Sequence, residues 1–396
     1  MAKELAYALI TPYSLMKSRT GGIIGRMLAL PTLRLVGAHM YAPSDAFVDE
    51  YVRSVEEQEI EPKIKGVLVK YINEHLRPSS VLGITNRMML LLFEGTDALR
   101  SLKDSVIGSL ASRTGPTGDT VRGTFGDMVE LETGEIIYFE PAVLTTTNSE
   151  TLYKQLALFE RYAARDGGAL ERVIRYPEGV KPETTLVIIK PDNFVRSSSR
   201  PGNIIDRFSR TGLYIVGAKV LKMSVAQARR FYEPLRQQFV ERLRKNVMAH
   251  LRGALEGAFD FPVDEETFEK IADELKDANA ECEFLKIVSY MTGVAPSECR
   301  AGEGSAPGKA TSLALLYQGE NAIDKIRRIL GSTNPDEAAE GTVRSDFGRN
   351  LMQNGAHASD TVESALRERR IVGLAGDEKE WEIQGIIRKY LSQAQR

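Results

Sequence analysis

Runs of β-branched apolar residues alternate with segments of helical spacing along the second half of the chain. The run "TLVIIK" at 185–190 is typical of a buried strand, and 201–212 has helical spacing that ends at Gly212. Residues 213–223 return to a strand pattern. The alternation continues as a helix, a strand and a helix, which we expect at 225–235, 311–319 and 321–331. The pattern therefore predicts short elements in the order strand, helix, strand, helix, strand, helix.

The chain contains an internal repeat that keeps the order of its landmarks. "GGIIGRM" at 21–27 recurs as "GNIIDRF" at 202–208, and "TVRGTFG" at 120–126 recurs as "TVRSDFG" at 342–348. The offset grows from 181 in the first pair to 222 in the second, so the second copy carries an insertion. Two copies of this alternation predict an α+β protein of two tandem ferredoxin-like (split βαβ) domains, the second with a helical insertion.

We expect the two copies to be separate domains joined by a linker. Residues 166–183 have the glycine, proline and charge typical of linkers. The first domain would then cover 1–165 and the second 184–396. We expect the inserted residues in two segments of the second domain, about 234–280 and 293–311.

The two inserted segments differ in character. The first has an apolar stripe with basic residues along 236–252, followed by an acidic stretch at 264–283, so the two charge sets could face each other. It is either a helical hairpin packed on the domain surface or a lid over an active cleft. The second is rich in Gly, Ala, Ser and Pro, which predicts a mobile loop.

Composition and charge narrow the class of protein. Hydrophobic residues make up 42% of 396 positions, charged residues 27%, and the formal net charge is −2, which disfavours nucleic acid as the main partner. The two cysteines, Cys282 and Cys299, form neither a metal-ligand cluster nor a disulfide framework. No signal-peptide pattern and no apolar run of about 18 residues is present. These features predict a cytoplasmic protein without a membrane partner.

Candidate chemistry gathers near the C-terminus and at the end of one strand. His357, one of four histidines, lies in "NGAHASD" at 354–360, where it could be a nucleophile, a metal ligand or an ordinary loop residue. Lys190 ends the buried strand in "IIKPDN" and could be a phosphate ligand or a surface charge. We expect Asp360 and Glu363 to form a capping box for the helix that follows.

Three runs of the second copy resemble the nucleoside diphosphate kinase family. They are "TLVIIKPDN", "GSTNPDEAAEGTVRSDFG" and "NGAHASDTVESALRE", and they follow one another in the family's order. Counted back from His357, Asn354 lies 3, Arg344 lies 13, Thr333 lies 24 and Arg327 lies 30 residues before it. These spacings are similar to those of the family's site.

The resemblance implies an enzyme that transfers the γ-phosphoryl group of ATP to a nucleoside diphosphate through phosphorylated His357. Phosphoryl transfer depends mainly on positioning and charge stabilisation. The resemblance further implies Mg²⁺ as cofactor, bridging phosphate oxygens rather than held in a protein cage, and a homo-oligomer built from dimers. Beside His357 it implies an orienting Glu368, nucleotide-binding Lys190, Arg327, Thr333, Arg344 and Asn354, and supporting Tyr232 and Ser359.

Several positions depart from the family's pattern. Gln353 replaces an arginine, and counting places Glu283, next to Phe284, where the family has an aromatic residue that stacks on the base. In the first copy Thr11 replaces Lys190, and no histidine follows Arg122, so we interpret this copy as catalytically silent. The alternative function for the whole chain is a nucleotide-binding or scaffolding protein of the same fold with little turnover.

Overall fold

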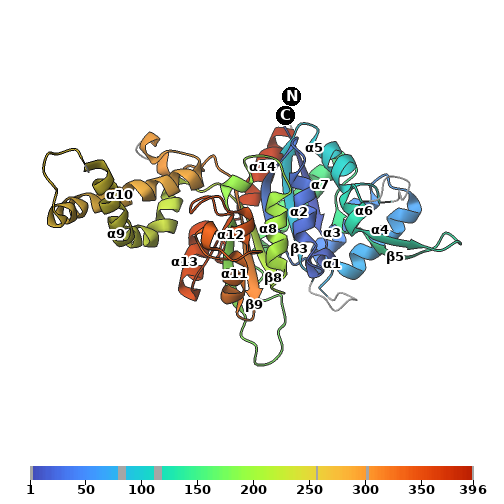
Figure 1. The fold of residues 1–396 in the computed structure, drawn as a ribbon. Coiled ribbons are helices and arrows are strands. Elements are labelled where there is room, and N and C mark those ends of the chain that lie inside the picture. Colours follow the sequence, from blue (N-terminus) through green and yellow to red (C-terminus); the bar gives the residue numbers. More distant parts are fainter. Residues whose placement is uncertain (1–2, 79–85, 111–117, 256, 300–302, 395–396) are drawn as a thin grey trace. The chain divides into compact units, whose positions relative to one another are not determined.

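The computed structural model describes residues 3–78, 86–110, 118–255, 257–299 and 303–394. The chain divides into two compact units (Figure 1). One unit contains Met1–Val220 and Leu313–Arg396, and the other contains Leu221–Ser312. The larger unit therefore holds both copies of the repeat, and the smaller unit holds most of the inserted residues.

Two four-stranded sheets with the same strand order form the centre of the larger unit. The first sheet has the order β2-β3-β1-β6 and the second the order β8-β9-β7-β10. All pairings within each copy that involve the central strands β1 and β7 are antiparallel. The strands are β1 (Glu4–Ile10), β2 (Leu33–Tyr41), β3 (Met88–Gly95), β6 (Val143–Leu144), β7 (Glu183–Ile189), β8 (Tyr214–Leu221), β9 (Ser312–Gly319) and β10 (Ala356–Ala358). The matching order confirms the predicted fold class.

Helices cover these sheets and follow the predicted order. In the first copy they are α1 (Pro12–Met16), α2 (Thr20–Leu28), α3 (Asp45–Glu56), α4 (Pro62–His75), α5 (Ala98–Arg100), the π-helix Ser101–Ile107, α6 (Val121–Phe125) and α7 (Ser149–Asp166). In the second they are α8 (Arg200–Ser209), α11 (Ala322–Leu330), α12 (Val343–Phe347), α13 (Val362–Val372) and α14 (Glu382–Ala394), with 3₁₀ turns at Pro191–Asn193 and Pro335–Glu337. Along the described stretches, no helix is both long and apolar enough to cross a membrane.

The two copies meet along helices α2 and α8, which approach closely because glycine lines the contact (Figure 1). A Cβ atom on Gly202 would lie 2.2 Å from the carbonyl oxygen of Gly21 and 2.5 Å from the backbone nitrogen of Gly25. A Cβ atom on Gly21 would lie 2.4 Å from the carbonyl oxygen of Gly202. No side chain larger than hydrogen fits at these distances, so the seam between the copies depends on these glycines.

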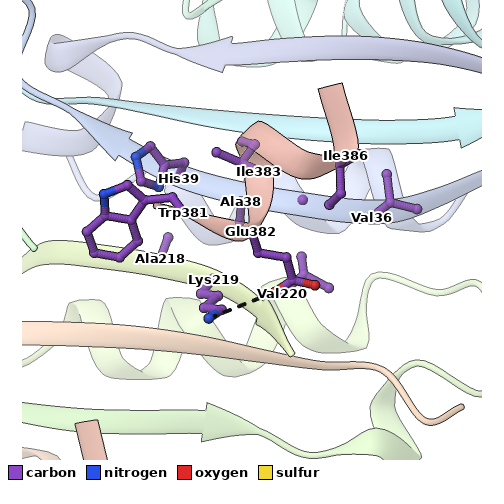
Figure 2. A pocket seen from close by; sticks show the side chains of 11 residues that line it. Val36, Ala38, His39, Ala218, Lys219, Val220, Trp381, Glu382, Ile383 and Ile386 are labelled. Atoms are coloured by element: carbon purple, nitrogen blue, oxygen red, sulfur yellow. Dashed lines mark ion pairs between the residues drawn. The ribbon is translucent and has the colours of Figure 1, made fainter. Parts of the chain in front are cut away.

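The C-terminal helix α14 crosses from the second copy to the first, which the sequence pattern did not predict. Its Gln384 donates to the carbonyl oxygen of Glu160 on α7 at 3.1 Å, and Arg388 forms an ion pair with Glu160 at 2.6 Å. Figure 2 shows the start of this helix over a small cavity between β2 and β8, where Trp381 faces His39. Helix α14 therefore connects the second copy to the first through these contacts.

The first copy contains a second feature that the pattern did not predict, a two-stranded hairpin of β4 (Asp127–Glu130) and β5 (Ile136–Glu140). It lies between α6 and β6. The corresponding part of the second copy, between α12 and β10, has no strand assigned. The two copies thus differ in the segment that leads to their last strand.

The smaller unit is a pair of long helices, α9 (Val225–Leu255) and α10 (Glu265–Thr292), followed by 3₁₀ turns at Pro296–Glu298 and Glu303–Ser305. Ion pairs join the basic helix to the acidic one, between Arg236 and Glu281 at 2.6 Å and between Arg252 and Glu265. The predicted facing of the two charge sets is confirmed. Residues 300–302 of the segment predicted as a mobile loop lie outside the described residues.

Candidate functional site

His357 lies on the edge strand β10, rather than in the loop that the sequence suggested. This strand pairs antiparallel with β7, and His357 is opposite Ile188. The chain reaches the edge through Gly355, whose φ of +82° is a left-handed conformation that favours glycine. The carbonyl oxygen of Gly355 accepts a hydrogen bond from the backbone N–H of Lys190 at 3.0 Å. Pairing in the sheet therefore fixes the backbone under the histidine.

Glu368 holds the imidazole from the neighbouring helix α13. Its Oε2 atom lies 2.8 Å from Nε2 of His357 and accepts a hydrogen bond from the Ser359 hydroxyl at 2.8 Å. Arg367 donates to the other oxygen, Oε1, at 3.3 Å. Glu368 is 5% exposed, so this carboxylate is shielded from water on the side that meets the ring. A proton on Nε2 would place the lone pair of a neutral imidazole on Nδ1.

The cap of α13 differs from the sequence prediction. Thr361, not Asp360, is the N-cap residue, and its hydroxyl accepts from the backbone N–H of Ser364 at 3.0 Å. Asp360 instead interacts with the Ser364 side chain, which lowers the pKa of this carboxyl together with the charges of Arg327 and His357. The predicted capping box of Asp360 and Glu363 is wrong, because the helix begins one residue later.

Lys190 lies directly after β7, and its ammonium is directed at the segment before β10. It donates to the carbonyl oxygen of Met352 at 2.9 Å and to Oδ1 of Asn354 at 2.6 Å. Burial and the nearby Arg344 lower the pKa of Lys190 to about 7, although Asp192 acts in the opposite direction. A bound anion would stabilise the charged form of this side chain.

Arg344 adds a second cationic side chain to the site, and Thr333 adds a hydroxyl group. The Arg344 guanidinium, on α12, donates to the carbonyl oxygen of Gly331 at 3.1 Å and to the Thr333 hydroxyl at 3.2 Å. Burial and the charge of Arg327 lower the pKa of Arg344 to about 10. Arg327 itself is exposed on α11. A buried arginine whose charge is disfavoured in this way is typical of a site that binds an anion.

Asn354 connects the two groups of side chains. Its amide Nδ2 donates to the carbonyl oxygen of Thr333 at 3.0 Å, while its Oδ1 accepts from Lys190. It is 1% exposed. The structure therefore links Lys190, Asn354, Thr333 and Arg344 by direct hydrogen bonds, and it links His357, Ser359 and Glu368 by a second set.

Tyr232 and the expected base-stacking position both lie in the smaller unit. Tyr232 is on α9, 5% exposed, with its ring 4.9 Å from that of Phe231. Phe284 is fully buried in the helical pair, where the Arg229 guanidinium lies 6.0 Å from its ring centroid. A fully buried Phe284 has no free face for a base. The supporting role of Tyr232 stays a prediction.

The first copy places other residues at the positions of this site. In its edge strand Leu144 is opposite Leu9, one step from the pair Val143 and Ile10. The second copy has His357 opposite Ile188, one step from Ala356 and Ile189. Counting from the N-cap residues, Asn148 and Thr361, places Gln155 where the second copy has Glu368. The strand registers also make Thr11, which directly follows β1, the counterpart of Lys190, which directly follows β7.

Side chains that bond to one another or to the backbone fill the first copy's equivalent region. The Thr11 hydroxyl donates to Oε1 of Glu140 at 3.0 Å, and Tyr71 donates to its Oε2 at 2.7 Å. Arg122 donates to the carbonyl oxygens of Gly108 and Val143, at 2.6 and 2.9 Å. Burial lowers the pKa of Arg122 to about 10 and raises that of Glu140. This arginine is therefore occupied by backbone oxygens instead of facing an open surface.

Comparisons with known proteins agree on one family for the second copy. A family profile described as "Nucleoside diphosphate kinase" matches residues 183–250 and 306–373. The nucleoside diphosphate kinase of Campylobacter fetus subsp. fetus is 31% identical over 186 residues, 47% of this chain and 91% of that protein. That of Wigglesworthia glossinidia brevipalpis is 30% identical over 189 residues, 48% of this chain and 90% of that protein. The match to the solved structure of an NDP kinase from Pyrobaculum aerophilum covers 48% of this chain and 95% of that protein's chain. The sequence identity is 26% and the TM-score is 0.34.

These matches are to a family of nucleotide-binding transferases of the kinase class. The chain belongs to the nucleoside diphosphate kinase family. The matched segments lie on either side of residues 251–305, all of which belong to the smaller unit.

Proposed function

We propose that the second copy is an active nucleoside diphosphate kinase and that His357 carries the phosphoryl group. The observation that carries the proposal is the 2.8 Å contact between His357 Nε2 and Glu368 Oε2, on a strand that pairs with β7, the strand that Lys190 follows. With Nε2–H donating to Glu368, the Nδ1 lone pair is the nucleophile. Positioning by a carboxylate keeps the ring in the required tautomer and stabilises the positive charge that develops on it.

The reaction has two half-reactions, and in each of them one bond to phosphorus forms and one breaks. In the first, Nδ1 of His357 attacks the γ-phosphorus of ATP, a nitrogen–phosphorus bond forms, and the bond from that phosphorus to the β-phosphate oxygen breaks, which releases ADP. In the second, a terminal phosphate oxygen of the acceptor diphosphate attacks the phosphohistidine, the nitrogen–phosphorus bond breaks, and the lone pair returns to Nδ1. A ping-pong mechanism follows.

The cationic side chains supply the charge stabilisation that phosphoryl transfer needs. Lys190 and Arg344 would bind phosphate oxygens, and their lowered pKa values support this role, because a nearby anion would stabilise each charge. Thr333 would add a hydroxyl donor, Arg327 a peripheral charge, and Asn354 would hold Lys190 in place.

The residues present fit a magnesium ion carried mainly by the substrate. The described residues contain no group of three or more His, Cys, Asp or Glu side chains arranged to hold a metal. Asp360 is an exposed carboxylate whose lowered pKa keeps it ionised beside His357 and Arg327. Asp360 would hold Mg²⁺ together with nucleotide phosphates, and the ion would neutralise part of their charge.

We further propose that the first copy is catalytically silent and that it serves as the fixed partner of the second. Leu144, Gln155 and Thr11 at the positions of His357, Glu368 and Lys190 support this proposal. The fused pair would also associate with further chains, as the family resemblance implies. A strict monomer in light scattering at micromolar concentration would contradict that last point.

A coupled assay with ATP, Mg²⁺ and a nucleoside diphosphate tests the proposed activity. We expect turnover by the full chain, parallel lines in a double-reciprocal plot when both substrates vary, and an ATP-dependent product that retains the acceptor's base. Nucleotide binding without turnover would contradict the proposal and support a scaffolding protein of the same fold.

A further inference from the structure

A small polar cavity lies at the seam between the two copies, away from the kinase site. It has a volume of about 20 Å³ and is lined from the first copy by residues that include Thr20 and Arg87, and from the second by residues that include Ser209 and Tyr317. A cavity of this size holds one water molecule or one monatomic ion.

Arg87 brings a buried positive charge to this cavity. It is 4% exposed, donates through one terminal nitrogen to the carbonyl oxygen of Ile215, and lies 5.2 Å from the ring centroid of Tyr214. Its Nε has no hydrogen-bond partner among the described residues, and no described carboxylate lies within ion-pair distance of the guanidinium. Burial lowers the pKa of Arg87 to about 10, yet the side chain is charged at neutral pH.

Tyr317 supplies a second donor in the wall of the same cavity. Its side chain is 1% exposed, and its hydroxyl has no hydrogen-bond partner in the described part of the chain. Burial and the charge of Asp206 raise the pKa of Tyr317, so the hydroxyl stays protonated. A buried hydroxyl or guanidinium N–H without an acceptor is costly, which indicates that an acceptor completes this site.

The repeat does not require these two groups. The strand registers place Thr311 in the second copy where the first has Arg87, and Phe93 in the first copy where the second has Tyr317. The symmetry-related position therefore carries neither the charge nor the phenol. Arg87 and Tyr317 therefore occur at only one of the two equivalent places in the fold. Because the other place does without them, we interpret them as groups that bind a ligand and not as groups that the fold requires.

We propose that this cavity binds a single halide ion, chloride under physiological conditions, between Arg87 Nε and the Tyr317 hydroxyl. A monatomic anion matches the volume, accepts from both donors, and compensates a buried charge that a water molecule would leave unpaired. The ion would contact both copies and so strengthen their association, because a ligand that binds only the folded state stabilises it by mass action.

Thermal unfolding provides the first test and does not depend on kinase activity. We expect the melting temperature to be higher by about 2 °C in 150 mM sodium chloride than in 150 mM sodium gluconate, whose anion is too large for the cavity. Tyr317→Phe removes one donor with little change of volume, and should weaken chloride binding about tenfold and remove most of the difference. Arg100→Met, which removes an exposed arginine, should keep the difference.

Crystals soaked in sodium bromide provide the second test. We expect an anomalous difference peak between Arg87 and Tyr317 in the wild type, a weaker peak in Tyr317→Phe, and no peak there in Arg87→Met. A wild type that melts at the same temperature in both salts and shows no bromide peak would overturn the proposal. An equal chloride effect in Tyr317→Phe and in the wild type would also overturn it.

Discussion

Leu144 and His357 occupy the same position on the edge strands of the two sheets. Leu144 is opposite Leu9 on β1, and His357 is opposite Ile188 on β7, at the same step from the ends of their strands. The fold therefore offers two equivalent positions for a nucleophile, and only one carries a side chain that can bond phosphorus.

This relationship predicts that a histidine alone does not activate the first copy. In the double variant Leu144→His with His357→Gln, we expect no phosphorylation by labelled ATP above the level of His357→Gln. The new imidazole would face the neutral Gln155 in place of a carboxylate and would lack the cation that Lys190 supplies. Acid-labile label in the double variant would show that the first copy binds triphosphate.

Removal of the Glu368 charge should slow transfer without a comparable loss of nucleotide binding. Glu368→Gln keeps the size of a side chain that is 5% exposed but removes the negative charge beside Nε2 of His357. We expect kcat to fall about 10–100-fold with a small change in KM, measured by the coupled assay. Glu363→Gln, an exposed position on the same helix, is the matched control and should be near wild type. Equal losses in both variants would contradict the role of Glu368.

The pKa of about 7 for Lys190 predicts proton uptake when nucleotide binds. The free protein has a largely neutral Lys190 at pH 8, whereas bound phosphates favour the ammonium and raise its pKa. Binding of ADP with Mg²⁺ should therefore take up close to one proton at pH 8 and little at pH 6, and affinity should fall as pH rises above 7. Titration calorimetry in buffers of different ionisation enthalpy measures this uptake. Lys190→Met should remove it, and an unchanged uptake in that variant would assign the proton elsewhere.

Strand and helix order could be predicted from periodicity because apolar runs such as 185–190 and the glycine after α11, Gly331, are strong local signals. Helix α14 could not, since its docking on α7 depends on contacts such as Gln384 with Glu160 that no local pattern encodes. The β4–β5 hairpin was missed because it has no counterpart in the second copy.

Residues of the candidate site could be predicted from the sequence only where their spacing along the chain matches that of the family. The family resemblance implied Asn354, Arg344 and Thr333 as site residues, and the structure joins them through hydrogen bonds to one another or to Lys190. Leu144 was not recognised as the counterpart of His357, because the hairpin shifts the numbering between the copies. Strand register was needed to find that equivalence.

The close contact between α2 and α8 predicts that one added methyl group at this contact lowers the stability of the protein. Gly202→Ala would place a Cβ atom 2.2 Å from the carbonyl oxygen of Gly21, so the helices must separate. We expect a loss of about 3 kcal/mol in unfolding free energy. Urea unfolding followed by the fluorescence of Trp381, the single tryptophan, measures this loss, because Trp381 lines a cavity between β2 and β8 of the two copies. Gly253→Ala, whose Cβ would meet no atom within 4 Å, is the matched control and should be neutral or slightly stabilising.

Incubation of the full chain with γ-labelled ATP and Mg²⁺, without acceptor, tests whether His357 is the phosphorylated nucleophile. We predict one acid-labile, base-stable phosphate per chain, located on His357 by mass spectrometry and released to added nucleoside diphosphate. His357→Gln should carry no such label while it still binds ADP. A His357→Gln protein that is labelled to the same extent, or that transfers phosphate at the wild-type rate, would contradict the account.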